Sequence, residues 1–182
     1  CKTFDDSADG FGRSEACGAI VVQPCRMSGG TTDRGDNTVA LVCGTAVNQD
    51  GRSASFMAPN GPSQEAVVRA ALADGNVAAE HVKYLETHGT GTAIGDPMEV
   101  GALGRVLGPR VTNNALVLGA LKSSIGHTEG AAGVMGVIKA AMVLQARCVP
   151  PNLHLRALNP KLELGKFVVG MPSTVQELRG VD

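Results

Sequence analysis

Two histidines stand at matching points of two similar stretches of this sequence. His88 ends the apolar run "VKYLETH" and opens "HGTGT", whereas His127 follows "ALVLGALKSSIG" and precedes a second apolar run. Imidazole exchanges protons near neutral pH, and a neutral ring can also donate a hydrogen bond to an oxygen that gains negative charge. Both histidines are therefore candidates for catalysis.

The loop after His88 alternates glycine with threonine and contains Thr90 and Thr92. One interpretation is a tight turn whose threonines bond only to the backbone. A phosphate-binding loop is the other, but the glycines do not form G-x-G-x-x-G and no G-K-[ST] follows. The nucleotide interpretation is the weaker one, and the pattern favours a site that holds something else beside His88.

His127 precedes a helix that we expect to begin near Glu129 or Gly130. A helix N-terminus carries partial positive charge and disfavours imidazolium, so a neutral ring is expected. Lys122, at the end of the same strand, would act in the same direction through its charge, although a surface position is the ordinary interpretation of a lysine. Two neutral imidazoles could together stabilise an oxyanion, and removal of one such donor commonly costs about 3 kcal/mol.

Neither the histidines nor the cysteines have the spacing of a metal site. The sequence lacks H-x-x-x-H and H-E-x-x-H among His81, His88, His127 and His154. It also lacks C-x-x-C, and the cysteines are odd in number: Cys1, Cys17, Cys25, Cys43 and Cys148. We therefore predict no metal, no disulfide framework and a reducing compartment.

Strands and helices alternate along the sequence. Apolar runs predict strands over 17–23, 38–47, 82–88 and 115–122, and the polar, glycine-rich residues 24–37 predict a surface loop. Helical periodicity predicts helices from Pro62 to Gly75, over 96–107 and over 131–146, the last ended by Pro150. This alternation is typical of an α/β sheet covered by helices on both faces, where ligands bind at the carboxyl ends of the strands.

Two of these helices carry more specific expectations. Asp96, Pro97 and Glu99 match an N-cap, a first helical position and the acidic partner of a capping box. The glycines spaced three or four apart in "AAGVMGVIKAAMVLQA" predict close packing of a central, buried helix. Because Lys139 interrupts this run and the run is short, we do not expect it to span a membrane.

Length and charge limit the remaining possibilities. The 182 residues suit one domain, and 16 basic against 17 acidic residues give a net charge of −1. Without a basic face, a nucleic acid or an anionic membrane is not the expected partner, and a small molecule or a protein is. No signal peptide is visible, so we expect a cytoplasmic location and leave organellar targeting open.

Taken together, the segments "CKTFDDSADGFGRSEACGAIVV", "GTAVNQDGRSASFMAPNGPSQEAVVRAAL", "YLETHGTGTAIGDPMEVGAL" and "GALKSSIGHTEGAAGVMGVIKAAMVLQARCVPPNLHL" resemble the ketosynthase (β-ketoacyl synthase) domain of type I polyketide synthases and multifunctional fatty acid synthases. The resemblance implies a thiolase-like, layered αβαβα fold and a homodimer. Residues 1–182 would be a partial domain, with about 1–50 ending the N-terminal half and 51–182 forming most of the C-terminal half.

The resemblance also implies a reaction and roles within it. The reaction is decarboxylative Claisen condensation of an acyl thioester with a malonyl-type unit carried on acyl carrier protein. His88 and His127 match the two catalytic histidines, Lys122 matches the lysine of that site, and Thr90 and Thr92 match threonines that contact the phosphopantetheine arm. No cofactor would bind directly, and the partners would be acyl carrier protein and other synthase domains such as the acyltransferase.

The nucleophilic cysteine of that family lies in a segment upstream of the one that matches Cys1. We therefore expect none of the five cysteines to accept an acyl group, and residues 1–182 alone to be inactive in condensation. Ser124, where asparagine is usual, departs from the pattern beside Lys122. Two alternatives stay open: a ketosynthase-like malonyl decarboxylase, and a non-catalytic partner similar to a chain-length factor.

Overall fold

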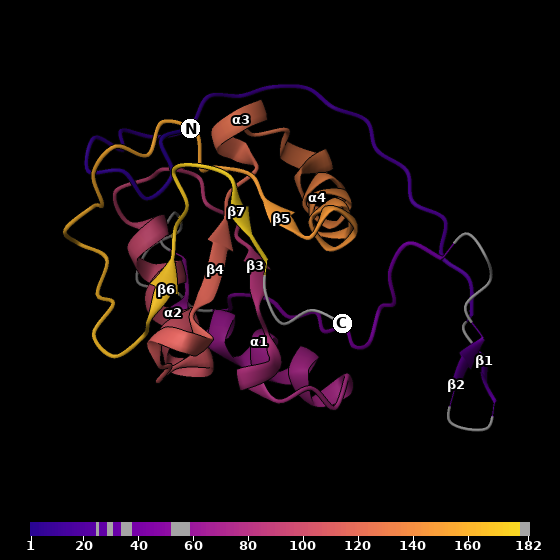
Figure 1. Ribbon diagram of the computed structural model, residues 1–182. Coiled ribbons are helices and arrows are strands. Elements are labelled where there is room, and N and C mark those ends of the chain that lie inside the picture. Colours follow the sequence, from indigo (N-terminus) through magenta and orange to yellow (C-terminus); the bar gives the residue numbers. More distant parts are fainter. Residues whose placement is uncertain (25, 29–30, 34–37, 52–58, 179–182) are drawn as a thin grey trace.

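A three-stranded parallel sheet forms the centre of the molecule (Figure 1). The computed structural model describes residues 1–24, 26–28, 31–33, 38–51 and 59–178. The strands are β3 (Tyr84–Glu86), β4 (Leu116–Gly119) and β6 (Val169–Gly170), in the order β3-β4-β6. Tyr84 pairs with Val117 and Leu116 pairs with Val169, so β4 is central and its residues are buried.

Helices cover both faces of this sheet, as the alternation of elements predicts. On one face α2 (Gly95–Leu107) packs on the sheet and α1 (Gly61–Asp74) packs on α2, whereas α4 (Ala132–Ala146) lies on the other face (Figure 1). Leu116 and Leu118 of β4 join the core formed with α2, and Val117 between them joins Val143 of α4. This alternation follows from the two-residue period of a strand.

Local signals account for the helix α1. The side chain of Asn60 accepts a hydrogen bond from the backbone of Ser63 at 3.2 Å, and Pro62 stands in the first turn. Gly75 follows the last helical residue, as predicted. The predicted strands at 82–88 and 115–122 are also confirmed, with the shorter bounds of β3 and β4.

Short elements complete the described chain. The 3₁₀ turns are η1 (Ala79–His81), η2 (Thr112–Asn114) and η3 (Glu129–Ala131), and α3 (Lys122–Ile125) is a single helical turn. Two antiparallel pairs are formed by β1 (Arg26–Ser28) with β2 (Thr31–Asp33) and by β5 (Cys148–Val149) with β7 (Gln176–Glu177).

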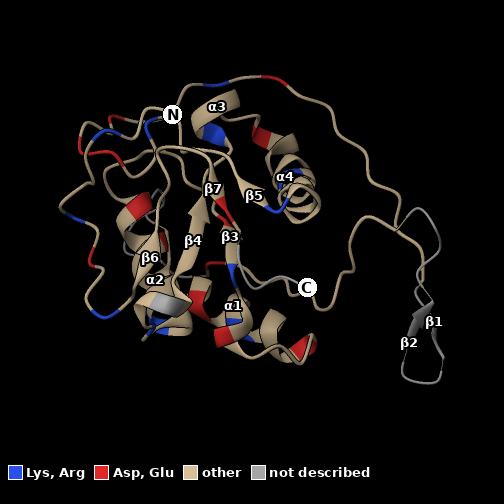
Figure 2. Ribbon diagram, in the orientation of Figure 1, with Lys and Arg blue, Asp and Glu red and all other residues tan. Residues whose placement is uncertain are grey.

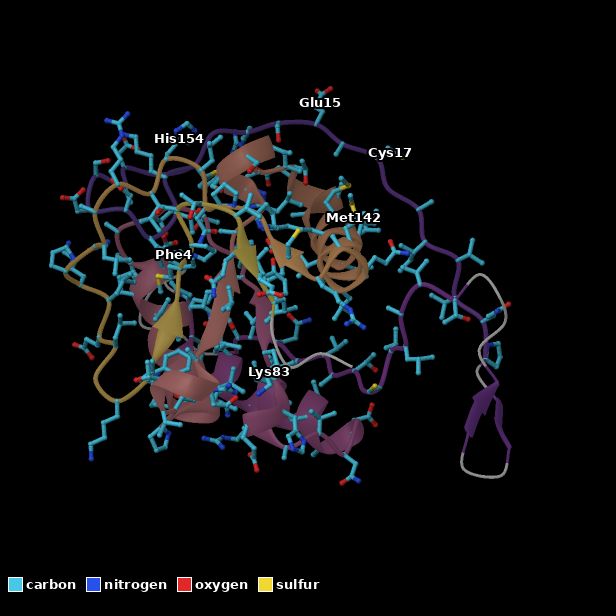
Figure 3. All side chains as sticks on the ribbon, viewed as in Figure 1. Phe4, Glu15, Cys17, Lys83, Met142 and His154 are labelled. Atoms are coloured by element: carbon cyan, nitrogen blue, oxygen red, sulfur yellow. The ribbon has the colours of Figure 1, made fainter. Side chains whose placement is uncertain are left out.

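The strands predicted over 17–23 and 38–47 are wrong. Both segments lie within the described residues, and neither forms a strand there. Val21 and Val47 are 98% and 92% exposed, and Figure 3 shows Cys17 on a long segment that runs away from the sheet. An apolar run becomes a strand only where a neighbouring strand accepts its hydrogen bonds, and these segments have none in the described part.

The loop predicted over 24–37 also needs correction, because its described part contains the β1–β2 pair, with Met27 opposite Thr32. Figure 1 shows this pair at the far end of the extended N-terminal segment, away from the three-stranded sheet.

The helix α4 is not the central, buried helix that its composition predicts. Within it only Lys139 and Val143 are buried, and Met142, labelled in Figure 3, is 61% exposed. The helix ends at Ala146, where Arg147 adopts the left-handed conformation with φ 50°, before Pro150 is reached. An apolar sequence predicts that a helix can be buried, and the neighbours decide whether it is.

With η3 in front of α4, the helical stretch begins at Glu129, one of the two starting points that the sequence predicts. By length and composition alone, the 18 residues Glu129–Ala146 could cross a membrane, so the expectation that the run is too short is wrong. Such a stretch is weak evidence of a span, because helices of soluble proteins pass the same test. Lys139, in the middle of this stretch, forms an ion pair with Glu86 of β3, so this part of the helix packs against the sheet.

Basic and acidic positions are mixed over the helices and loops of the described chain (Figure 2). This distribution agrees with the near balance of charges in the sequence. The site must therefore be recognised from individual side chains and not from the field of a large charged surface.

Candidate active site

The two histidines singled out in the sequence lie side by side in the structure. Their ring centroids are 5.3 Å apart, with an interplanar angle of 84°. His88 follows the carboxyl end of β3, and His127 lies between α3 and η3, after the carboxyl end of β4. Because β3 and β4 are adjacent and parallel, both loops emerge at the same edge of the sheet.

Each ring is oriented by a hydrogen bond to its Nδ1 atom. The Nζ of Lys122 lies 3.3 Å from Nδ1 of His88, and the backbone N–H of Glu129 donates to Nδ1 of His127 at 3.0 Å. An ammonium or amide N–H can only donate, so both Nδ1 atoms accept. The ring proton of each histidine is thereby assigned to Nε2, which leaves two N–H donors for a ligand.

The sequence predicts that Lys122 lies at the end of the strand, and this is wrong. Lys122 begins the short helix α3 after β4. The chain turns at Ala120, whose carbonyl accepts the N–H and the hydroxyl of Ser123 at 3.1 and 2.7 Å. This turn directs the buried Lys122 side chain back toward His88. The outcome is the contact that the sequence interpretation requires, reached by a different backbone path.

Desolvation and the positive charge of Lys122 lower the pKa of His88 from 6.5 to about 4, although the residue is exposed where it lines a cavity. Burial lowers the pKa of Lys122 as well, and the carboxylates of Glu99 and Glu86 oppose this effect. For His88, desolvation and the charge of Lys122 both disfavour a second positive charge at the site. His88 is therefore neutral at physiological pH.

A titration should show this directly. We expect the NMR signals of His88 to titrate with a midpoint near pH 4, well below its ordinary value of 6.5. Between these values the unfolded chain binds a proton that the folded chain does not, so stability is fully present above about pH 6.5 and falls as the pH drops toward 4. A His88 midpoint near 6.5 would contradict the interpretation.

The loop between His88 and α2 is held by two carboxylates. Glu99 accepts the backbone N–H groups of His88 and Gly89 at 2.6 and 2.9 Å. Asp96, which is fully buried, accepts those of Phe4 and Gly91, both at 2.9 Å. Burial raises the pKa of both carboxyl groups, and these N–H donors oppose it.

The predicted capping box is therefore wrong. The helix α2 begins at Gly95 and its N-cap is Ile94, which makes no side-chain hydrogen bond. Asp96 and Glu99 turn away from the helix end because the glycine-rich loop presents unpaired N–H groups to them. Their sequence spacing was recognisable, but the groups they bind come from the tertiary structure.

The two threonines lie on the same loop, beside His88. Their hydroxyl oxygens are 3.2 Å apart, and the Oγ1 of Thr92 accepts the N–H of Gly95 at 3.0 Å. Thr90, Thr92 and His88 line a cavity of about 780 Å³, within the size range of small-molecule sites. The rest of its lining includes apolar side chains of α1 and α2, among them Val67, Val68, Ala102 and Leu103.

At two positions of this loop, the backbone conformation and the neighbouring N-terminal segment both require glycine. Gly89 and Gly91 have φ values of +48° and +74°. A Cβ on Gly89 would lie 2.8 Å from the side chain of Thr3, and one on Gly91 would lie 3.0 Å from the backbone of Lys2. The N-terminal segment thus packs against the loop, in addition to any approach by a ligand.

The sequence interpretation missed Phe11. Its ring centroid lies 5.1 Å from that of His127, and its side chain also lines the cavity beside His88. The local sequence gives one weak signal for Phe11, a large aromatic side chain within a glycine-rich stretch. It does not identify the partner His127, which is 116 positions away.

The described cysteines lie outside the cavity beside His88, although Cys1 approaches the segment that holds His127: its Sγ lies 4.0 Å from the backbone oxygen of Gly12, which accepts the N–H of His127 at 2.8 Å. Cys1, Cys17, Cys43 and Cys148 are unpaired thiols, and Cys25 lies outside the described residues. None of the described residues that line the cavity is a cysteine. Cys148 lies in the strand β5, beyond the end of α4. Cys17 and Cys43 belong to the segments that were predicted as strands, and neither lies in a described strand. In the described part, no group of three His, Cys, Asp or Glu side chains is placed to hold a metal ion.

Known proteins are similar in sequence to most of this chain. The family described as "Beta-ketoacyl synthase, C-terminal domain" matches residues 39–156. A phenolphthiocerol/phthiocerol polyketide synthase of Mycobacterium tuberculosis is 46% identical over 163 residues, 89% of this chain. A highly reducing polyketide synthase of Penicillium roqueforti is 40% identical over 173 residues, 95% of this chain. The chain spans 8% of the length of each synthase.

Solved structures agree. An oxazolomycin ketosynthase domain of Streptomyces albus is 34% identical and superposes with a TM-score of 0.72, covering 77% of this chain and 24% of its own. A mutant ketosynthase from module 6 of the bacillaene synthase of Bacillus subtilis is 27% identical, with a TM-score of 0.82 over 100% of this chain and 32% of its own. The chain therefore belongs to the β-ketoacyl synthase family, as part of a ketosynthase domain with a thiolase-like fold.

Proposed function

We propose that this chain supplies the histidine pair of a site that condenses acyl thioesters with loss of carbon dioxide, in polyketide biosynthesis. One observation carries the proposal: His88 and His127 lie 5.3 Å apart, each with Nδ1 occupied and Nε2 left as a donor. A pair of neutral N–H donors suits a carbonyl oxygen that becomes an enolate oxygen. The family membership of the chain supports the same reaction class.

The chemistry follows from that charge. In a malonyl-type thioester, the bond between the carboxylate and the α-carbon breaks, carbon dioxide leaves, and the electron pair passes into an enolate. The two Nε2–H groups stabilise the enolate oxygen without giving up their protons. The α-carbon then attacks the acyl thioester of a cysteine, a C–C bond forms, and the thiolate leaves. That cysteine is expected outside residues 1–182.

Lys122 supports the pair indirectly. Its contact with Nδ1 of His88 holds the ring and fixes the proton on Nε2. The same ammonium group keeps His88 neutral, because a second positive charge beside it is unfavourable. We assign Lys122 to the site for these two effects and not as a proton donor to substrate.

The cavity beside His88 would receive the substrate arm. A phosphopantetheine arm is long, narrow and polar along its length, and Thr90 and Thr92 offer hydroxyl groups in the cavity wall. The apolar side chains of α1 and α2 would face the acyl portion. This assignment makes acyl carrier protein and further synthase domains the partners, in a cytoplasmic homodimer. It also retains the division of the domain at about residue 50.

Carbon dioxide release tests the proposal. The complete polypeptide that contains this sequence should release carbon dioxide from malonyl-pantetheine and form a β-ketoacyl product when an acyl thioester is present. Residues 1–182 alone should acquire no acyl group, as measured by intact-protein mass spectrometry. If the complete polypeptide showed no carbon dioxide release and no condensation, the proposal would be refuted. Carbon dioxide release without condensation would favour the decarboxylase alternative.

A further inference from the structure

A buried ion pair lies behind the histidine site. Lys139 is the one charged residue within the apolar helix α4, and it is only 8% exposed. Its Nζ lies 2.8 Å from Oε2 of Glu86, and their side chains are 10% and 9% exposed. A buried pair of this kind carries a desolvation cost, so its presence is weakly explained by stability alone.

Glu86 is also bound on its remaining sides. Its Oε1 accepts the backbone N–H of Leu121 at 2.5 Å, and its Oε2 accepts the hydroxyl of Tyr84. Gly119 leaves room for these contacts, since a Cβ there would lie 2.1 Å from the Tyr84 hydroxyl and 2.9 Å from Oε2 of Glu86. A Cβ on Gly136 of α4 would lie at ordinary contact distance, 3.6 Å, from Cγ of Glu86. The carboxylate is therefore held between β3, β4 and α4.

The backbone connects this carboxylate to the site at two points. Glu86 is two residues before His88, and Leu121, whose N–H it binds, immediately precedes Lys122. Movement of the Glu86 side chain would release the start of α3, where Lys122 makes its 3.3 Å contact with Nδ1 of His88. The pair thus contacts the segment that positions the lysine, without touching the cavity lining.

We propose that Glu86, held in place by Lys139, positions Lys122 and helps to keep it protonated for the reaction, an inference that rests on the proposed function. Glu86 and Lys139 are positioning residues, since neither lines the cavity. The charge of Glu86 acts on Lys122 through space, and Lys139 limits that charge while fixing the carboxylate in place.

Several charged groups act on Lys122 together. Glu99 approaches from α2 and Glu86 from β3, and both raise the pKa of Lys122 against the effect of burial. His88 faces its Nζ, and the amino group of Cys1 lies 3.4 Å from its backbone oxygen. Loss of one carboxylate charge therefore lowers the pH at which the lysine loses its proton.

Two substitutions should move the pH profile in opposite directions. In the complete polypeptide, Glu86→Gln should lower kcat for carbon dioxide release about tenfold and shift its alkaline limb about one pH unit lower. Lys139→Met should shift that limb higher, because the carboxylate is then no longer partly neutralised. KM for malonyl-pantetheine should stay within about threefold in both variants, since neither residue touches substrate.

Matched variants separate this charge effect from packing. Tyr84→Phe removes a hydrogen bond to the same carboxylate without changing charge, so its alkaline limb should coincide with that of the wild type. Glu65→Gln breaks the exposed ion pair with Arg105 on α1 and α2 and controls for ion pairs elsewhere. Circular dichroism establishes folding before each profile is recorded.

The outcomes are distinguishable. Limbs that move in opposite directions support the inference, whereas limbs that coincide with the wild type, or that move together, overturn it. If Glu86→Gln does not fold, the limb of Lys139→Met decides alone, and only an upward shift supports the inference. Absence of carbon dioxide release by the wild type would instead refute the proposed function.

Discussion

His127→Ala should lower the kcat of carbon dioxide release by about 10²- to 10³-fold in the complete polypeptide, because one of two donors to the enolate oxygen is lost. KM should change little, since this donor acts on charge that develops only in the transition state. The backbone of His127 keeps its hydrogen bonds to Gly12 and Ser14, so the surrounding fold should persist. Steady-state kinetics with malonyl-pantetheine provide the measurement.

His81→Ala is the matched control for this substitution. His81 is exposed on η1, before the amino end of β3, whereas the histidine pair lies beyond the carboxyl ends of β3 and β4, so replacement of His81 should leave kcat unchanged. If His127→Ala also left turnover unchanged, the pair would not be catalytic. That result would favour the alternative in which this chain belongs to a non-catalytic partner.

Arg110→Leu should produce the largest loss of local stability. The guanidinium of Arg110, 7% exposed, donates to the backbone oxygens of Leu107 at 2.9 Å, Val82 at 2.8 Å and Asn114 at 3.3 Å, and also to that of Ala79. One side chain therefore joins the end of α2 to η1, to η2 and to the start of β3. Leucine would leave these carbonyl groups without their donor, at a cost of about 3 kcal/mol.

Hydrogen exchange measures this loss within the complete polypeptide. Amides around η1, η2 and the start of β3 should exchange on the order of 100-fold faster in the Arg110→Leu variant, which corresponds to about 3 kcal/mol. Arg69→Leu is the control, because Arg69 is exposed and its guanidinium donates one bond within the described residues, from Nη2 to the backbone oxygen of Arg105 at 2.9 Å. Equal exchange in the two variants would show that Arg110 does not join these elements.

The sequence by itself determined the elements whose signals are local. Pro62 and Gly75 bound α1 as predicted, and the apolar runs at 82–88 and 115–122 contain β3 and β4. These signals depend on backbone geometry and on burial at a fixed period, so they need no knowledge of distant residues. The order of motifs in the chain likewise determined its family, which relatives and solved structures confirm.

The sequence also determined which side chains meet, though not how. His88 and His127 were expected together because they follow neighbouring strands, and their rings are 5.3 Å apart. Their roles, with those of Lys122, Thr90 and Thr92, stay predictions. The contact of Lys122 with His88 depends on a helical turn after β4, which the apolar pattern of the strand does not reveal.

Only the tertiary structure decided the partners of polar groups. Asp96 and Glu99 have the spacing of a helix cap, yet they bind the glycine-rich loop, because its N–H groups have no partner within their own segment. Lys139 interrupts an apolar helix for no local reason and finds Glu86 across the sheet. The segments 17–23 and 38–47 have the composition of strands, yet no described strand pairs with them. In each instance a hydrogen bond or ion pair needs two groups, and the sequence near one of them does not identify the other.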